Sequence, residues 1–77
     1  MPEVVSRDSV IVIKVALPNL KAARKRAGLS YRQLEEYSAV PFRRLWNYEN
    51  GLRASVLDAR ALAAALHLKL SELTGSQ

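Results

Sequence analysis

Residues 28–51 read GLSYRQLEEYSAVPFRRLWNYENG. Ser30 and Gln33 have the spacing of a capping box, in which the serine side chain caps a helix and the glutamine returns the bond. Pro41 is excluded from a helix interior but is tolerated in the first turn of a helix. A glycine such as Gly51 commonly ends a helix. These signals predict two short helices joined by a three-residue turn, at about residues 31–38 and 41–50.

The second of these helices has two distinct faces. Leu45 and Tyr48 share one face at helical spacing, and Val40 comes just before them, so these three side chains are expected in the core together with Leu34 of the first helix. The opposite face carries a different set, namely Phe42, Arg43, Trp46 and Asn47. Two aromatic side chains, an arginine and an asparagine are therefore expected at the surface.

Further helices are expected on both sides of this stretch. Pro18 and Asn19 mark a helix start, and that helix is expected to run to about Ala27, before Gly28, with Ala27 as one of its inward-facing residues beside Leu20 and Ala23. A second capping box, at residues 55–58, opens a helix with an apolar stripe formed by Val56, Ala59, Leu62, Ala63 and Leu66. A last short helix is expected at about residues 70–73.

The N-terminal segment has a different character. Residues 1–9 are polar and without periodicity, which predicts a loose arm. Residues 10–17 are rich in β-branched side chains, which favours an extended strand. No second convincing strand is found in the chain. Pairing with the same strand of a second subunit, giving a two-stranded dimer ribbon, is one interpretation; an extended arm lying across the helices is the other.

Composition limits the class of protein. The 77 residues allow one domain, and 12 leucines and 11 alanines favour helix. No cysteine is available for a disulfide, and a single histidine, His67, predicts no metal site. The longest apolar run is too short to span a bilayer, so a soluble cytoplasmic protein without a membrane partner is expected. Neither a nucleophile with a base nor a phosphate-binding glycine loop is present, so the sequence predicts no enzyme and no cofactor.

The charge is unevenly distributed. The net charge is +5, and the excess lies between residues 18 and 53, where eight basic residues face three acidic ones. A localised basic surface attracts the phosphate backbone of nucleic acid. A solvated face that keeps a small protein soluble is the alternative interpretation of the same pattern.

The order of these marks resembles the Cro/C1-type helix-turn-helix family over about residues 19–73. The resemblance is carried by Gly28-Leu29-Ser30, by Glu49-Asn50-Gly51, and by the Ser-Val and Leu-Ala-x-x-Leu run that starts at Ser55. It implies an all-α fold, a compact bundle of about five short helices of the lambda-repressor-like type, with an N-terminal β-strand or extended arm. It also implies two parts, an arm at residues 1–17 that is a candidate for dimerisation and a DNA-binding domain at residues 18–74.

The family's functional residues map onto this sequence by position. The resemblance assigns base reading to Phe42, Arg43 and Asn47, whose chemistry suits thymine methyl, guanine and adenine respectively. It assigns phosphate binding to the start of the first helix of the motif, at Tyr31 and Arg32, and to the loop after the second, at Asn50 and Arg53. We expect Arg44 to contact phosphate as well. An ion pair that some members use to tie two helices together matches Arg24 and Glu49.

Several positions depart from the family pattern. Tyr31 stands where glutamine usually binds a phosphate, and Pro41 replaces a Ser or Thr cap. Ala39 and His67 stand where the family has glycine. Ser38 replaces a large apolar residue, and the neighbouring Tyr37 is expected to fill the gap.

The resemblance implies a transcriptional regulator, expected to be a repressor that binds an inverted repeat in double-stranded DNA as a homodimer. The alternative is an antitoxin-like or other protein-interaction module that uses the same fold. The exposed aromatic residues Phe42 and Trp46 favour a protein partner, whereas the surrounding arginines favour DNA.

Overall fold

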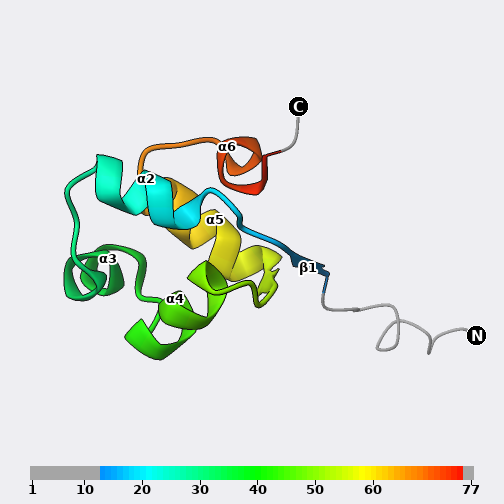
Figure 1. Ribbon diagram of the computed structural model, residues 1–77, viewed down its shortest axis with the longest axis horizontal. Coiled ribbons are helices and arrows are strands. Elements are labelled where there is room, and N and C mark those ends of the chain that lie inside the picture. The colour runs from blue at the N-terminus through cyan, green and yellow to red at the C-terminus, as the bar shows by residue number, and fades with distance from the viewer. Residues whose placement is uncertain (1–12, 76–77) are drawn as a thin grey trace, which may run out of the picture.

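The structure is a computed structural model that describes residues 13–75. Five helices and one two-stranded sheet make up this part of the chain, in the order β1 (Lys14–Val15), α2 (Leu20–Arg26), α3 (Tyr31–Ser38), α4 (Phe42–Glu49), β2 (Ala54–Ser55), α5 (Val56–Ala65) and α6 (Leu70–Thr74). Helix α5 lies in the middle, with α2 and α6 above it and α3 and α4 below it in the view of Figure 1. The predicted all-α bundle with an N-terminal strand is confirmed.

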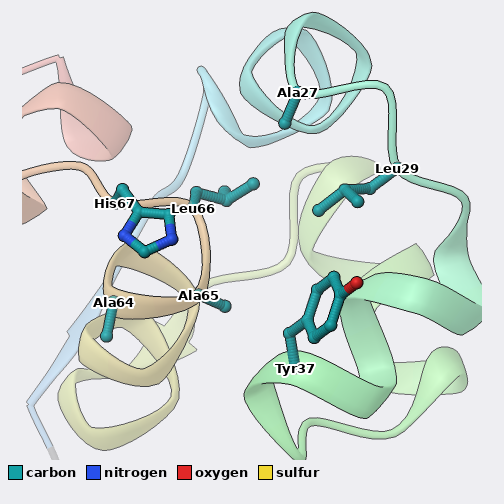
Figure 2. Close-up of a pocket in the computed structure, with 7 residues that line it drawn as sticks. All are labelled: Ala27, Leu29, Tyr37, Ala64, Ala65, Leu66 and His67. Carbon is teal, nitrogen blue, oxygen red and sulfur yellow. The ribbon is translucent and has the colours of Figure 1, made fainter.

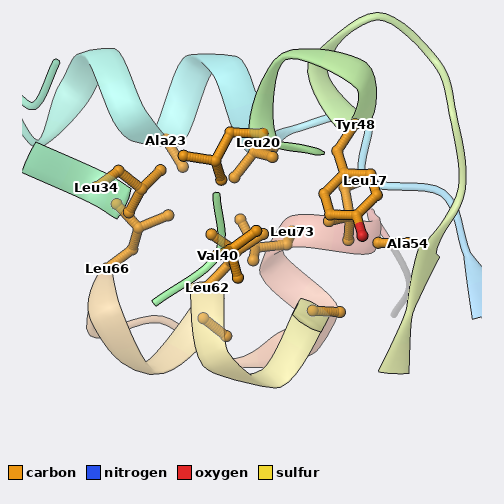
Figure 3. Packing of buried hydrophobic residues seen from close by; sticks show 13 residues of the cluster. Leu17, Leu20, Ala23, Leu34, Val40, Tyr48, Ala54, Leu62, Leu66 and Leu73 are labelled. Atoms are coloured by element: carbon orange, nitrogen blue, oxygen red, sulfur yellow. The ribbon is translucent and has the colours of Figure 1, made fainter. Parts of the chain in front are cut away.

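The core is built from one fully buried leucine of each helix. Their side chains, which all have an exposed fraction of 0%, are Leu20, Leu34, Leu45, Leu62 and Leu73. Figure 3 shows the surrounding cluster, to which Val40 and Tyr48 contribute as expected. Burying a leucine side chain stabilises a fold by roughly 1.5–3 kcal/mol. All five helices are therefore held by the same small core.

Local signals in the sequence determine the ends of α3. The Ser30 side chain accepts a hydrogen bond from the Gln33 backbone N–H at 3.1 Å, and the Gln33 side chain accepts one from the Ser30 backbone N–H at 2.9 Å. At the other end, Ala39 adopts a left-handed conformation. Pro41 then precedes α4 without any side-chain cap. Both helices of the predicted pair are confirmed at these positions.

Strand β1 pairs with β2 of the same chain, so the expectation that the chain holds no second strand is wrong. The antiparallel register sets Lys14 opposite Ser55 and Val15 opposite Ala54. The backbone N–H of Val56 also donates to the carbonyl of Ile13 at 3.2 Å. The part of the predicted dimer ribbon at residues 10–12 lies outside the described residues. Strand β2 has only two residues and no run of β-branched side chains. Its composition therefore does not predict a strand, and it is identified only by its pairing with β1.

One side-chain expectation near α3 is also wrong. Tyr37 does not fill the space at Ser38: its exposed fraction is 63%, and it lines a surface hollow with His67 and Leu66 (Figure 2). The buried Ser38 hydroxyl instead donates to the Leu34 carbonyl at 2.7 Å and accepts from the Val40 N–H at 3.2 Å. A small polar side chain is therefore accommodated because the backbone satisfies it.

The ends of α2 and α5 differ in detail from the expectation. Ala27 is exposed rather than inward-facing; α2 ends at Arg26, and Ala27 is its C-cap residue. The Asn19 side chain does not cap α2; it donates to the Glu72 carbonyl at 2.9 Å and ties α2 to α6. Of the second expected capping box, only the bond from the Asp58 N–H to the Ser55 side chain is present. None of the helices within residues 13–75 is long and apolar enough to cross a membrane.

Two residues without the freedom of glycine adopt positive φ angles, Ala39 at 65° and His67 at 58°. A left-handed conformation costs a residue with a Cβ roughly 1–2 kcal/mol. We expect Ala39→Gly and His67→Gly each to raise the free energy of unfolding by about 1 kcal/mol. Ala22→Gly, at an exposed site inside α2, is the matched control and is expected to lower it by about 1 kcal/mol. Urea denaturation measures all three; a loss of stability in both Ala39→Gly and His67→Gly would contradict this reasoning.

Candidate functional site

The exposed face of α4 forms the candidate site. Leu45 and Tyr48 are the buried residues of α4, and the opposite side of the helix lies at the surface. A shallow hollow on that surface is lined by Phe42, Arg43, Trp46 and Asn47. Phe42 and Trp46 are about half exposed, at 49% and 50%. The face expected from the sequence is therefore present as one continuous surface.

A buried carboxylate determines how α4 sits against α2 and α3. The Glu49 side chain is only 1% exposed, and its Oε2 accepts a hydrogen bond from Nε of Arg24 at 2.6 Å. Its Oε1 accepts from Nη2 of Arg24 at 3.3 Å and from the Tyr31 hydroxyl at 2.7 Å. The Arg24 Nη1 donates to the Leu29 carbonyl at 2.9 Å. The hydrogen bond with Glu49 raises the pKa of Arg24 and also that of Tyr31.

Tyr31 extends this network to the first residue of α4. Its ring lies beneath the guanidinium of Arg24, with Cζ 4.1 Å from the ring centroid. The Phe42 ring meets the Tyr31 ring edge to face, with centroids 5.1 Å apart and planes at 76°. Among the described residues, the aromatic ring contact of Phe42 is thus with Tyr31 rather than with Trp46. The hydroxyl hydrogen that a phosphate contact of Tyr31 requires is directed at Glu49.

A second carboxylate joins α4 to α5. Asp58 accepts hydrogen bonds from the Tyr48 hydroxyl and, at 2.9 Å, from Nη1 of Arg44. Burial and the hydrogen bond to Asp58 raise the pKa of Tyr48 to about 12. Arg44, an expected phosphate contact, therefore has a protein partner, although its side chain is 51% exposed.

The remaining candidates for phosphate binding differ in whether their side chains already have hydrogen-bond or ion-pair partners in the described part of the chain. Arg32 and Arg53 are exposed, as is Arg43, and none of these three has a side-chain hydrogen bond or ion pair within residues 13–75. The side-chain amide of Asn50 donates one hydrogen to the Trp46 carbonyl at 2.7 Å, which closes the end of α4. Its second amide hydrogen has no acceptor within the part of the chain that the structure describes.

Sequence reasoning missed Lys14. Its side chain lines a hollow of about 280 Å³ together with Arg44, Arg53 and Ser55. The signal that places it there is the pairing of β1 with β2, and that pairing is not visible before β2 is identified. Within the part of the chain that the structure describes, no group of three or more His, Cys, Asp or Glu side chains is arranged to hold a metal ion.

Comparison with known proteins gives one match. The model of a helix-turn-helix family matches residues 20–73, which is more than half of the chain. Neither the curated proteins nor the solved structures contain a match. The matched range contains the whole α4 surface and both carboxylate networks.

Removing one partner of the buried ion pair should destabilise the fold strongly. Arg24→Met leaves the Glu49 carboxylate buried without its cation, and we expect the free energy of unfolding to fall by about 3–5 kcal/mol. The double variant Arg24→Met/Glu49→Met removes the buried charge as well, so its loss is expected to be smaller than that of the single variant. Chemical denaturation of both variants measures the two losses. A free energy of unfolding of Arg24→Met within about 1 kcal/mol of wild type would show that the ion pair does not stabilise the fold.

Stability is expected to depend on pH in the alkaline range. The pKa of Tyr48 is raised to about 12 in the folded chain, against about 10 when unfolded, so the unfolded chain loses this proton first. The free energy of unfolding should therefore be unaffected by Tyr48 below about pH 10 and fall as the pH rises from about 10 to 12. In Tyr48→Phe the free energy of unfolding should fall less between about pH 10 and 12 than in wild type. Tyr37→Phe, which removes an exposed hydroxyl, is the control and should behave as wild type. Equal alkaline profiles for Tyr48→Phe and wild type would exclude this role of the Tyr48 hydroxyl.

Proposed function

The chain belongs to the Cro/C1-type helix-turn-helix family, and on this basis we propose that it is a transcriptional repressor that binds an inverted-repeat operator in double-stranded DNA as a homodimer. The family is one of DNA-binding transcription regulators and is not enzymatic. The observation that carries the proposal is the exposed face of α4, where Arg43, which has no side-chain partner within residues 13–75, lies beside Asn47 and Phe42.

The chemistry of this face suits base edges in the major groove. Arg43 is exposed, and its guanidinium can hydrogen-bond bidentately to guanine. Asn47 lies one turn further along the same helix face, where its amide suits adenine. Phe42, supported by the ring of Tyr31, presents an apolar edge to a thymine methyl group. We assign base reading to these three residues.

Phosphate contacts would position the helix without reading sequence. Arg32 at the start of α3 and Arg53 after α4 lie on either side of the exposed face of α4, called the reading face below. Their guanidinium groups have no ion pair within residues 13–75 and can bind phosphate. Asn50 offers one amide hydrogen, and Arg44 can share its guanidinium between Asp58 and a phosphate. We assign Tyr31 a supporting role, because its hydroxyl is bound to Glu49.

We propose a homodimer because one α4 helix can contact only a short stretch of DNA. Three reading side chains cover only a few base pairs, and a two-fold axis doubles the site into an inverted repeat, with half-sites about one helical turn, roughly 34 Å, apart. Sedimentation of the chain with an inverted-repeat duplex should give two chains per duplex. A single chain bound per duplex would exclude the dimer.

A second candidate function is binding of a partner protein by the same face, as in an antitoxin-like module. The half-exposed rings of Phe42 and Trp46 favour it, because exposed aromatic side chains are typical anchors of protein interfaces. The two candidates differ in which substitution matters. Binding of DNA depends on Arg43, whereas binding of a protein would depend on Trp46 and be nearly independent of salt.

Fluorescence anisotropy with the duplex that binds best tests the proposed function. Affinity should fall steeply with salt, with a log–log slope of several units. Arg43→Ala should weaken binding by about 1–3 kcal/mol and relax the preference among duplexes. Lys69→Ala, at the start of α6 on the opposite side of the molecule from α4 in Figure 1, removes the same charge and should change neither preference nor fold. A flat salt response, or equal binding of all duplexes by wild type, would exclude the proposal.

A further inference from the structure

The small β1–β2 sheet has an outward face that the core does not use. Side chains alternate between the two faces of a strand, and residues paired across an antiparallel sheet share a face. Ala54 is fully buried and is paired with Val15, so this pair faces the core. The other pair, Lys14 and Ser55, therefore lies on the outward face. The register thus brings an ammonium and a hydroxyl together at the surface.

Basic side chains from three separate segments meet at this face. The hollow of about 280 Å³ is lined by Lys14 of β1, Arg44 of α4 and Arg53 of the connection between α4 and β2. Because Arg44 belongs to the helix that carries the reading face, the hollow adjoins that face at its flank. The three positive charges lie 9 to 39 residues apart in sequence, so folding rather than local sequence gathers them.

The negative charge in the hollow is already compensated. Asp58 also lines it, but its carboxylate accepts hydrogen bonds from both Arg44 and Tyr48. Lys14 and Arg53 have no ion pair within the described part of the chain. The Ser55 oxygen accepts from the Asp58 N–H, and its own hydrogen has no acceptor among residues 13–75. Two cations and one hydroxyl donor are therefore available to an anion.

We propose that this hollow binds one phosphate of the DNA backbone, and that β1 is thereby a DNA-contacting element. In this arrangement Lys14 and Arg53 donate to the non-bridging oxygens of the phosphate, and Ser55 adds a hydroxyl donor. The volume accommodates a phosphodiester group, and the donors around it are of the types that bind phosphate in protein–DNA complexes. The inference rests on the proposed function, because the phosphate belongs to the duplex that α4 reads.

The salt dependence of binding measures this contact. Each phosphate neutralised on duplex DNA contributes about 0.9 to the slope of log affinity against log salt. Lys14→Gln should therefore reduce the slope by about 1 and weaken binding to preferred and non-preferred duplexes by the same factor. Lys14→Arg should keep the wild-type slope, and Lys69→Gln is the charge-matched control that should keep it too. Thermal unfolding of each variant verifies that the fold is intact.

Substitution on the DNA identifies the phosphate itself. Duplexes with one neutral methylphosphonate at a time are titrated with wild type and with Lys14→Gln. One position is expected to weaken binding by wild type several-fold and to have a smaller effect on Lys14→Gln, in which one of the two cations at this phosphate is already lost. The same position should also have a smaller effect on Arg53→Gln than on wild type. An unchanged salt slope for folded Lys14→Gln, on a duplex that wild type binds selectively, would overturn this inference and leave the proposed function standing. Absence of selective binding by wild type would overturn both.

Discussion

The carboxylate of Glu49 is the interaction on which the position of α4 depends. A carboxylate that is 1% exposed is unfavourable unless its charge is paired and its oxygens are hydrogen-bonded. Arg24 from α2 and Tyr31 from α3 supply these bonds, so three helices meet at one side chain. Because Arg24 also binds the Leu29 carbonyl, the connection between α2 and α3 is held by the same guanidinium. The orientation of α4 is therefore determined by its last residue, Glu49, which must lie within hydrogen-bond distance of Arg24 and Tyr31.

The other side of α4 is held by a second carboxylate, Asp58 of α5. Together the two networks divide the basic residues into two groups. Arg24 and Arg44 are engaged in holding helices together, whereas Arg43 and Arg53 are left without partners in the described part of the chain. This division places positive charge around the exposed face of α4 while the charges beneath it are neutralised. The excess of charge between residues 18 and 53 thus has both a structural and a surface component.

The parts of the fold that were predictable from sequence are those with local causes. The ends of α3 follow from Ser30 and Gln33 and from the turn before Pro41, because each signal lies within a few residues of the helix end it determines. Strand β2 was not predictable in this way. It has two residues, and it is defined by a partner about forty positions earlier in the chain. Because this pairing also places Lys14 beside Arg53 and Ser55, no local pattern indicates Lys14 as a candidate site residue.

Side-chain roles were harder to predict than helix positions. The spacing within α4 was sufficient to expect Phe42, Arg43 and Asn47 on one exposed face, because helical periodicity alone determines it. The hydroxyl of Tyr31 has a partner 18 residues away, which no local pattern indicates. Ser38 was expected to leave a gap that a tyrosine fills, yet its hydroxyl is satisfied by the backbone of its own helix and turn. Long-range pairing and backbone satisfaction are both invisible to residue patterns.

We propose that α4 and the segments beside it form the surface that meets duplex DNA. Chemical-shift mapping of the isotope-labelled chain during titration with a duplex tests it most directly. The largest changes are expected in α4, at residues 50–53 and at Lys14, with α6 unaffected. Changes confined to α6 or to the hollow beside Tyr37 and His67 in Figure 2, or the absence of any change, would contradict the claim.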